Sequence, residues 1–83
     1  MTYNYKSFVE MIDDLKRGAD IEFEYNGVRY SITPNWSNNV IIGYEIGRFY
    51  SSDFTFYSDA MEMGTYILDG EMLKDVVHKL VIY

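Results

Sequence analysis

The chain lacks most of the groups that hold very small proteins together or carry catalysis. It has no cysteine, which excludes disulfide bridges and thiolate zinc sites. It has one histidine, His78, and one proline, Pro34. Packing must therefore stabilise its 83 residues, of which 48% are apolar and 18% aromatic, the composition of a folded domain. We expect a single domain over residues 1–83.

Long apolar runs are also missing. No stretch is long enough to span a bilayer, and residues 1–6 lack the basic start and apolar stretch of a signal peptide, so the expected location is the cytoplasm. Thirteen Asp and Glu against seven Lys and Arg give a formal charge of −6. This charge repels nucleic acid and anionic membranes. We therefore expect a protein partner with a basic surface and no direct binding to nucleic acid or membrane.

The first predicted element is a helix over about residues 7–17. Ser7 and Glu10 have the capping-box spacing, in which each side chain accepts a hydrogen bond from the other residue's backbone N–H. Gly18 supplies the left-handed residue that ends a helix. Between these signals, apolar residues recur on one buried stripe: Phe8, Met11, Ile12 and Leu15.

The strongest pattern is an antiparallel hairpin over residues 21–33, with Asn26-Gly27 at its turn. Asn-Gly is the preferred type I′ turn because both central residues need a positive φ. On one face the turn pairs Glu24 with Arg29. The other face then collects six apolar side chains: Ile21, Phe23, Tyr25, Val28, Tyr30 and Ile32.

A third strand is predicted over residues 40–47. We expect the second strand to end at Pro34, which cannot donate to a ladder, and a turn to follow over residues 35–39. Gly43 and Gly47 leave one face of the third strand bare, so that another segment can pack closely there. The opposite face is apolar: Val40, Ile42, Tyr44 and Ile46.

Residues 49–57 are interpreted as an irregular aromatic crossover, followed by a short helix that starts near Asp59 and ends at Gly64. Asp69 is predicted to cap a last helix. Its core-facing residues would be Met72, Leu73, Val76, Val77 and Leu80. The expected order is α-β-β-β-α-α, an α+β fold in which a three-stranded antiparallel meander packs against helices.

The sequence contains no recognisable catalytic constellation. His78 falls near the end of the last helix, where the helix dipole favours a structural histidine, and no nucleophile elbow supplies a serine. None of the six glycines forms a phosphate-binding loop. The densest carboxylates, Asp13-Asp14 and Glu22 with Glu24, lack metal-loop spacing. We therefore predict no enzymatic activity, no metal and no cofactor.

Two runs resemble short uncharacterised acidic proteins of Gram-positive bacteria and their prophages. One is the hairpin from Ile21 to Ile32, and the other, from Leu68 to Asp75, is similar to the Asp-Gly-x-x-Leu helix start of those proteins. The resemblance implies a fold but no activity. In size, charge and element order the chain is also similar to small anti-CRISPR inhibitors of phages, which mimic DNA and occupy the basic groove of a nuclease.

Size, charge and this resemblance together predict a non-catalytic phage or prophage inhibitor, acting in the host-cell cytoplasm on a bacterial defence or nucleic-acid enzyme. Trp36, in a polar loop, either covers its own core or anchors the partner. The predicted DNA-mimicking face comprises Glu10, Asp13, Asp14, Glu22, Glu24, Trp36 and Glu45.

Two alternatives stay open. The first is a binder or sequestering oligomer for a small molecule such as a nucleotide signal, in which Trp36 stacks on the base while Arg29 and Arg48 hold the phosphate. The second is a protein-interaction module of undefined partner.

Overall fold

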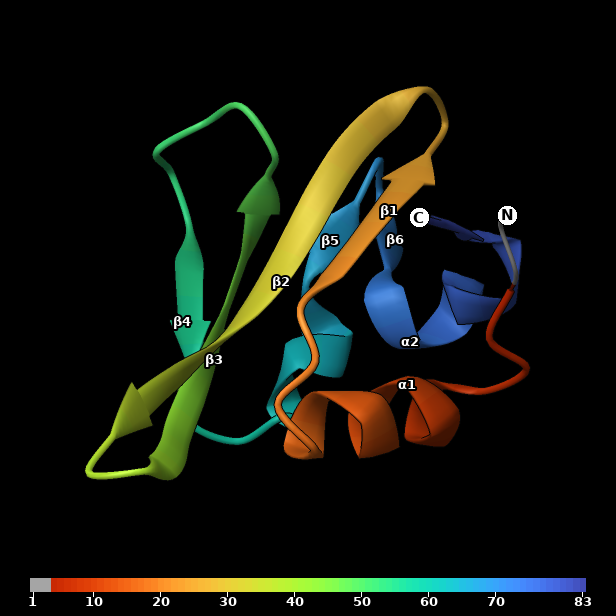
Figure 1. Cartoon of the computed structure of the whole chain (residues 1–83). Helices are drawn as coiled ribbons and strands as arrows, with labels where there is room; N and C mark the ends of the chain where they lie inside the picture. The colour runs from red at the N-terminus through yellow and green to blue at the C-terminus, as the bar shows by residue number, and fades with distance from the viewer. Residues whose placement is uncertain (1–3) are drawn as a thin grey trace.

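The computed structural model describes residues 4–83 (Figure 1). In chain order its elements are α1 (Phe8–Lys16), β1 (Ile21–Tyr25), β2 (Val28–Ser37), β3 (Val40–Arg48), β4 (Thr55–Tyr57), the 3₁₀ helix η1 (Glu62–Thr65), β5 (Ile67–Leu68), β6 (Glu71–Met72), α2 (Leu73–Val76), the 3₁₀ helix η2 (Val77–Lys79) and β7 (Val81–Ile82). The fold is α+β, as the sequence predicts.

Most strands belong to one five-stranded antiparallel sheet in the order β4-β3-β2-β1-β7. The predicted three-stranded meander forms its centre, but the expected element order is incomplete because two further strands flank the meander. The C-terminal β7 returns to β1, where Phe23 lies opposite Ile82 and Glu24 opposite Val81. Separately, β5 and β6 form a short hairpin.

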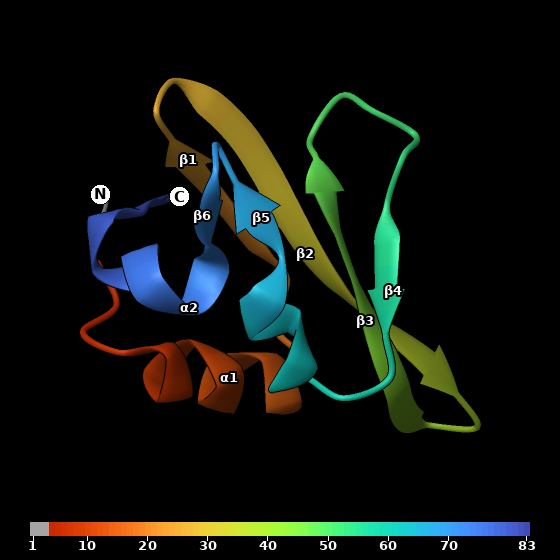
Figure 2. The ribbon, with the colours of Figure 1, turned by 180° about the vertical axis from the view of Figure 1, so that it is seen from behind.

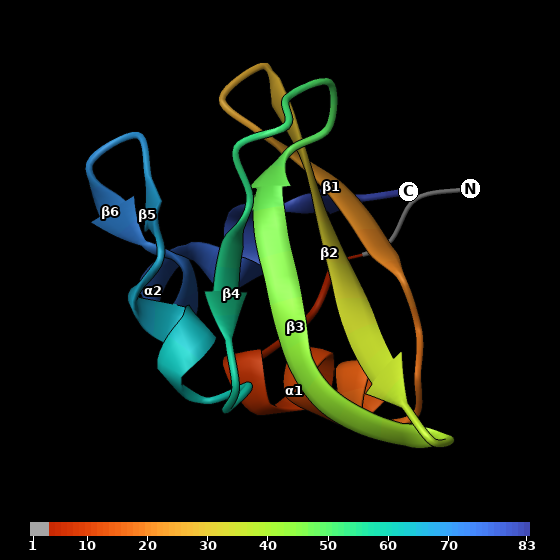
Figure 3. The same cartoon turned by 90° about the vertical axis from the view of Figure 1, so that its left-hand side faces the viewer.

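The helical elements and the β5–β6 hairpin lie on one side of the sheet. Figure 2 shows α2, β5 and β6 in front of β1 and β2, and Figure 3 shows these elements to one side of the strands. One continuous core fills the space between them. Its most deeply buried side chains include Met11, Ile12, Leu15, Phe23, Ile32, Ile46, Met63, Leu68, Leu73 and Leu80. No described helix covers the opposite face of the sheet, which we call the open face.

The predicted first helix is confirmed in α1. Ser7 Oγ accepts a hydrogen bond from the Glu10 N–H at 3.3 Å, which satisfies one of the free donors at the helix start, but among the described residues the reciprocal bond to the Glu10 carboxylate is not formed. Gly18 follows the last turn with φ of +93°. The helix buries the four residues of the predicted apolar stripe.

The β1–β2 hairpin has the predicted register, with Tyr25 opposite Val28. Its turn residues, Asn26 and Gly27, have φ values of +50° and +80°. Glu24 lies opposite Arg29, but the two form no ion pair within the described chain. Instead, Tyr83 contacts both residues. Its hydroxyl donates to Glu24 Oε1 at 2.9 Å, and its ring centre lies 4.0 Å from the Arg29 guanidinium carbon.

The prediction that Pro34 ends the second strand is wrong. β2 continues to Ser37, and Pro34 is buried opposite Tyr44 of β3. Proline fits a strand where one edge has no partner, because it cannot donate to a ladder. Such an edge exists here: pairing of β1 with β2 ends at Ile21 opposite Ile32, so β2 runs past β1 before it reaches Pro34.

The turn expected over residues 35–39 is shorter than predicted. It consists of Asn38 and Asn39, with φ values of +50° and +66°. Trp36 is consequently a strand residue, opposite Ile41 of β3 and next to a bulge in the ladder.

The apolar face predicted for the third strand is only half buried. Tyr44 and Ile46 belong to the core, whereas Val40 and Ile42 are exposed. The reason is the length of the β2–β3 hairpin, whose tip extends past the rest of the sheet (Figure 1). The bulge next to Trp36 also shifts the alternation of β3, so that Ile41 instead of Ile42 packs against the core.

Within the crossover expected over residues 49–57, the chain forms a strand, β4, that the sequence interpretation missed. β4 pairs with β3, placing Phe56 opposite Glu45. The close packing predicted at the two strand glycines is confirmed. A Cβ on Gly43 would clash with the Phe56 ring, and one on Gly47 would lie 2.8 Å from the Asp53 carbonyl oxygen.

The last predicted helix starts too early. Asp69 and Gly70, with φ values of +50° and +86°, form the turn of the β5–β6 hairpin instead of a helix cap. The helix α2 begins only at Leu73, and Met72 is exposed instead of facing the core. The short helix expected from Asp59 to Gly64 is present only in part, as the 3₁₀ helix η1, which begins at Glu62 and ends at Thr65.

Candidate functional site

Three of the predicted carboxylates lie together on the open face of the sheet. Glu22 and Glu24 alternate along β1 with buried residues, so their side chains point away from the core. Glu45 lies on β3 opposite Thr33, which is exposed, and therefore belongs to the same face. The open face thus presents carboxylates from both β1 and β3.

Two of these carboxylates are held by neighbouring side chains. Glu45 Oε1 accepts a hydrogen bond from Asn35 Nδ2 at 2.7 Å, and Glu24 Oε1 accepts one from the Tyr83 hydroxyl. A side chain that is already oriented loses less conformational entropy when a partner binds it. The arrangement therefore favours recognition of a cationic surface by Glu24 and Glu45.

The remaining predicted carboxylates, Glu10, Asp13 and Asp14, lie on α1 and not with the open face. In Figure 3, α1 lies at the lower end of the view, below the strands, so its outer surface is not part of the open face of the sheet. The seven-residue face expected from the sequence is therefore divided between two surfaces.

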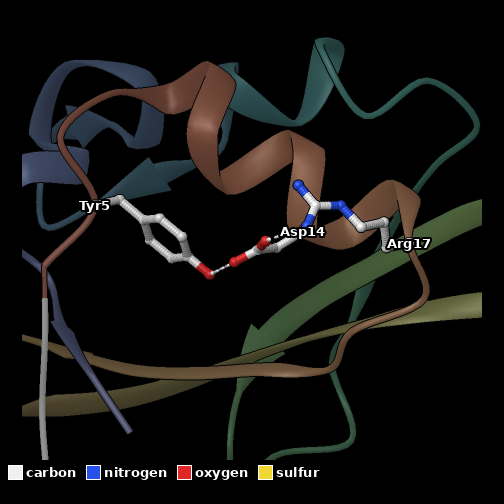
Figure 4. A network of polar contacts seen from close by, with 3 residues as sticks. All are labelled: Tyr5, Asp14 and Arg17. Carbon is white, nitrogen blue, oxygen red and sulfur yellow. Dashed lines mark hydrogen bonds and ion pairs between the residues drawn. The ribbon is translucent and has the colours of Figure 1, made fainter.

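Asp14 is also engaged within the chain (Figure 4). It accepts a hydrogen bond from the Tyr5 hydroxyl at 2.7 Å and forms an ion pair with Arg17 at 3.8 Å. Exposed Lys6 and Lys16 add further positive charge at this surface. The charge of the α1 surface is consequently mixed, whereas the open face has a net negative charge.

Trp36 lies on the projecting β2–β3 hairpin and remains 56% exposed. Its ring contacts Gly18 at the end of α1, where a Cβ would lie 2.8 Å from the Trp36 Cζ2 atom. The indole therefore rests against its own domain while a large part of it faces solvent. Both interpretations of Trp36 as core cover and as partner anchor are compatible with this position.

The sequence interpretation missed the exposed apolar residues near Trp36. Val40 and Ile42 on the hairpin, and Phe56 on β4, are all more than half exposed, at 61%, 52% and 51%. Phe56 packs over Gly43 of β3, and exposed apolar side chains of this size occur at interaction surfaces. The alternating pattern of β3 indicated one apolar face but not how far the hairpin extends beyond the core.

At the other end of the sheet, a shallow groove of about 450 Å³ contains Arg29 and Arg48. The remaining lining residues are Gly27, Val28, Tyr50 and Ser51. The nucleotide site considered from the sequence combined these two arginines with Trp36, but Trp36 lies toward the opposite end of β2. Tyr50, which is 86% exposed, is the aromatic residue that the structure places beside them.

Several tyrosine hydroxyls titrate above their usual range. The pKa of Tyr25 is raised because its hydroxyl donates to Glu71 Oε2 at 2.6 Å, and burial and nearby negative charge act in the same direction. A hydrogen bond to Glu24 likewise raises the pKa of Tyr83. Burial raises the pKa of Tyr44 and Tyr66. These side chains are therefore neutral at physiological pH.

No protein-family model, curated protein or solved structure matches the chain. Within residues 4–83, no group of three His, Asp or Glu is placed to hold a metal ion. The helices of the same residues are too short or too polar to cross a membrane. His78 is exposed in η2, near the end of the helical segment, as its position in the sequence suggested.

Proposed function

We propose that the chain is a non-catalytic inhibitor of phage or prophage type that binds a bacterial defence or nucleic-acid enzyme. Its open face occupies the basic groove in which that enzyme holds nucleic acid. The observation that carries the proposal is the presence of Glu22, Glu24 and Glu45 on a sheet face that no described helix covers. The resemblance to prophage proteins supports the choice of partner.

Electrostatics favour a partner with a phosphate-binding groove. The chain has a formal charge of −6, so its long-range field attracts a basic protein and speeds encounter. The same charge repels nucleic acid, which makes the chain a competitor of nucleic acid and not its ligand. Binding through exposed carboxylates weakens as salt is raised.

The proposed contact surface extends around the hairpin tip to Trp36, whose ring lies on the helix side of the sheet against Gly18. Aromatic residues that fill a partner pocket contribute a large share of binding energy at protein interfaces. In this proposal the carboxylates steer association and Trp36 slows dissociation. The α1 carboxylates Glu10, Asp13 and Asp14 are outside this surface.

Capture and competition test the proposal. The tagged chain is used to capture proteins from a Gram-positive host lysate, and each captured enzyme is tested for binding to labelled DNA or RNA. We expect a nucleic-acid enzyme from which the chain displaces the labelled strand, with an affinity that falls as salt is raised. Trp36→Ala should dissociate faster, by about tenfold or more, because a hot-spot aromatic is lost.

Val9→Ala is the matched control, since Val9 is an equally exposed apolar residue on α1, at 58% against 56% for Trp36. It should leave dissociation unchanged. The proposal is contradicted if the captured enzyme binds the chain and its nucleic acid at the same time, or if capture returns only proteins without a nucleic-acid site.

A further inference from the structure

Arg29 places a positive charge among the carboxylates of the open face. It lies opposite Glu24 in the β1–β2 ladder, and Glu24 points away from the core, so the Arg29 side chain is on the same face. Arg48, in contrast, lies opposite the buried Tyr30, which puts its side chain on the inner face of the sheet. Of these two arginines, Arg29 alone can therefore enter a contact made by the open face.

Tyr83 keeps Arg29 and Glu24 from neutralising each other. Opposite charges at facing strand positions attract, and an ion pair between them would occupy both groups. Instead, the Tyr83 hydroxyl donates to Glu24 Oε1 at 2.9 Å, and within residues 4–83 Arg29 forms no ion pair. The sheet holds Tyr83 in place, because its N–H donates to the Glu22 carbonyl at 2.9 Å. The open face therefore presents a carboxylate and a separate guanidinium side by side.

Two aromatic rings fix the Arg29 guanidinium. Its carbon lies 4.0 Å from the centre of the Tyr83 ring and 5.3 Å from that of Phe49. The Phe49 N–H also donates to the Arg29 carbonyl at 2.9 Å, so this ring is tied to the strand that it supports. A guanidinium stacked on rings keeps its N–H edge available, and that edge matches the two oxygens of a carboxylate. Because it is already oriented, Arg29 loses less conformational entropy on binding.

The chemistry of the partner groove gives this cation a role, and here the inference rests on the proposed function. A groove that holds nucleic acid is basic along the phosphates, but enzymes that cut or join strands hold Mg²⁺ there with carboxylates. Without the metal, those carboxylates would repel a purely acidic face. We propose that Arg29 pairs with the metal-binding carboxylates of a Mg²⁺-dependent nucleic-acid enzyme and takes the place of its Mg²⁺, while Glu22, Glu24 and Glu45 meet the basic part of the groove.

Competition by Mg²⁺ tests this pairing. Affinity of the captured enzyme for the chain is measured by surface plasmon resonance in EDTA and in magnesium chloride at equal ionic strength, after melts show that all variants are folded. We expect Mg²⁺ to weaken wild-type binding about tenfold or more, because the metal and Arg29 compete for the same carboxylates. Arg29→Gln should bind about tenfold more weakly in EDTA and respond little to Mg²⁺. Arg29→Lys should keep the response, because it keeps the charge.

Arg48→Gln is the matched control, since it removes the same charge from the inner face. It should bind, and respond to Mg²⁺, like the wild type. Equal affinities of Arg29→Gln and Arg48→Gln in EDTA would overturn the inference but leave the proposed function standing. So would an equal effect of Mg²⁺ on the wild type and Arg29→Gln, the result expected if the metal binds carboxylates of the chain itself. An enzyme that binds the chain and nucleic acid at the same time would overturn both.

Discussion

Single residues with a positive φ determine where this chain reverses direction. Asn26-Gly27, Asn38-Asn39 and Asp69-Gly70 each place two consecutive residues in the left-handed region, as a type I′ turn requires. Asparagine, aspartate and glycine tolerate that region better than other residues. The three turns join β1 to β2, β2 to β3 and β5 to β6. Turn chemistry therefore sets the register of every hairpin that carries a proposed site.

Replacing Gly27 with valine tests this control at one position. A Cβ at Gly27 would meet no other atom within 4 Å, so the whole cost comes from a β-branched residue held at φ of +80°. We expect a loss of about 1–2 kcal/mol in the free energy of unfolding. Each kcal/mol lost should lower Tm by about 4–8 °C. Thermal melts measure both.

Gly27→Asn is the matched control, because asparagine tolerates the left-handed region and should lose much less stability. An unchanged Tm in Gly27→Val would contradict the turn geometry.

At the scale of elements, two hairpins distant in the sequence are joined through their turns. Asn26 Nδ2 donates to Asp69 Oδ2 at 2.8 Å, and the Tyr25 hydroxyl donates to Glu71 Oε2. The β5–β6 hairpin has only two residue pairs of its own, so such contacts are needed to hold it. They dock it against the end of β1.

The Tyr25 contact makes stability depend on alkaline pH. Its hydrogen bond to Glu71 raises the folded-state pKa of Tyr25 above the ordinary value of 10.0. The stabilisation is complete below pH 10 and is lost as the pH rises through the folded-state pKa, because only the unfolded chain then readily loses the proton. Urea unfolding between pH 8 and about pH 11.5 should show this decline, and Tyr25→Phe should make it shallower and lower the stability at pH 8.

Tyr50→Phe is the control, because Tyr50 is almost fully exposed and donates no hydrogen bond to the described chain. It should keep the wild-type slope. An identical slope in Tyr25→Phe would show that the Tyr25 hydroxyl does not titrate differently in the folded and unfolded states.

Local signals were sufficient to predict α1 and the β1–β2 hairpin. Three local features carry this prediction: the Ser7 cap, the Gly18 helix end and the Asn26-Gly27 turn. Each depends on contacts within a few residues, so distant parts of the chain do not alter the structure that it predicts. Elements that depend on distant contacts were missed. β4 is only three residues long and exists because Gly43 leaves room for Phe56, and β7 pairs with a strand near the other end of the sequence.

Two errors have a different origin, because the same residue type serves two structures. An Asp-Gly pair can begin a helix or form a type I′ turn. Here the antiparallel pairing of Ile67 with Met72 requires the turn. Proline ends a central strand but is tolerated where one edge of its strand is unpaired. Because β1 begins too late in the chain to pair with this part of β2, the edge of β2 at Pro34 is free. The candidate site depended equally on tertiary structure, because β-strand alternation groups Glu22 with Glu24 but does not exclude Asp13.

At the scale of the whole molecule, two surfaces differ in charge. The open face carries Glu22, Glu24 and Glu45 together with Arg29, whereas the outer surface of α1 carries mixed charge. This separation makes the proposal specific. If total charge alone attracted the partner, any exposed carboxylate would contribute equally, whereas a docked open face requires the carboxylates of the sheet.

The most direct test compares two double charge reversals on different surfaces of the molecule. Glu22→Lys with Glu24→Lys alters the open face, and Glu10→Lys with Asp13→Lys changes the net charge equally on α1. Association rates with the captured enzyme are measured by surface plasmon resonance over a series of salt concentrations, after melts show that both variants are folded. We expect the open-face variant to associate about tenfold or more slowly, with a reduced salt dependence, and the α1 variant to stay close to the wild type. Equal rates and salt dependence for the two variants would contradict recognition through the open face.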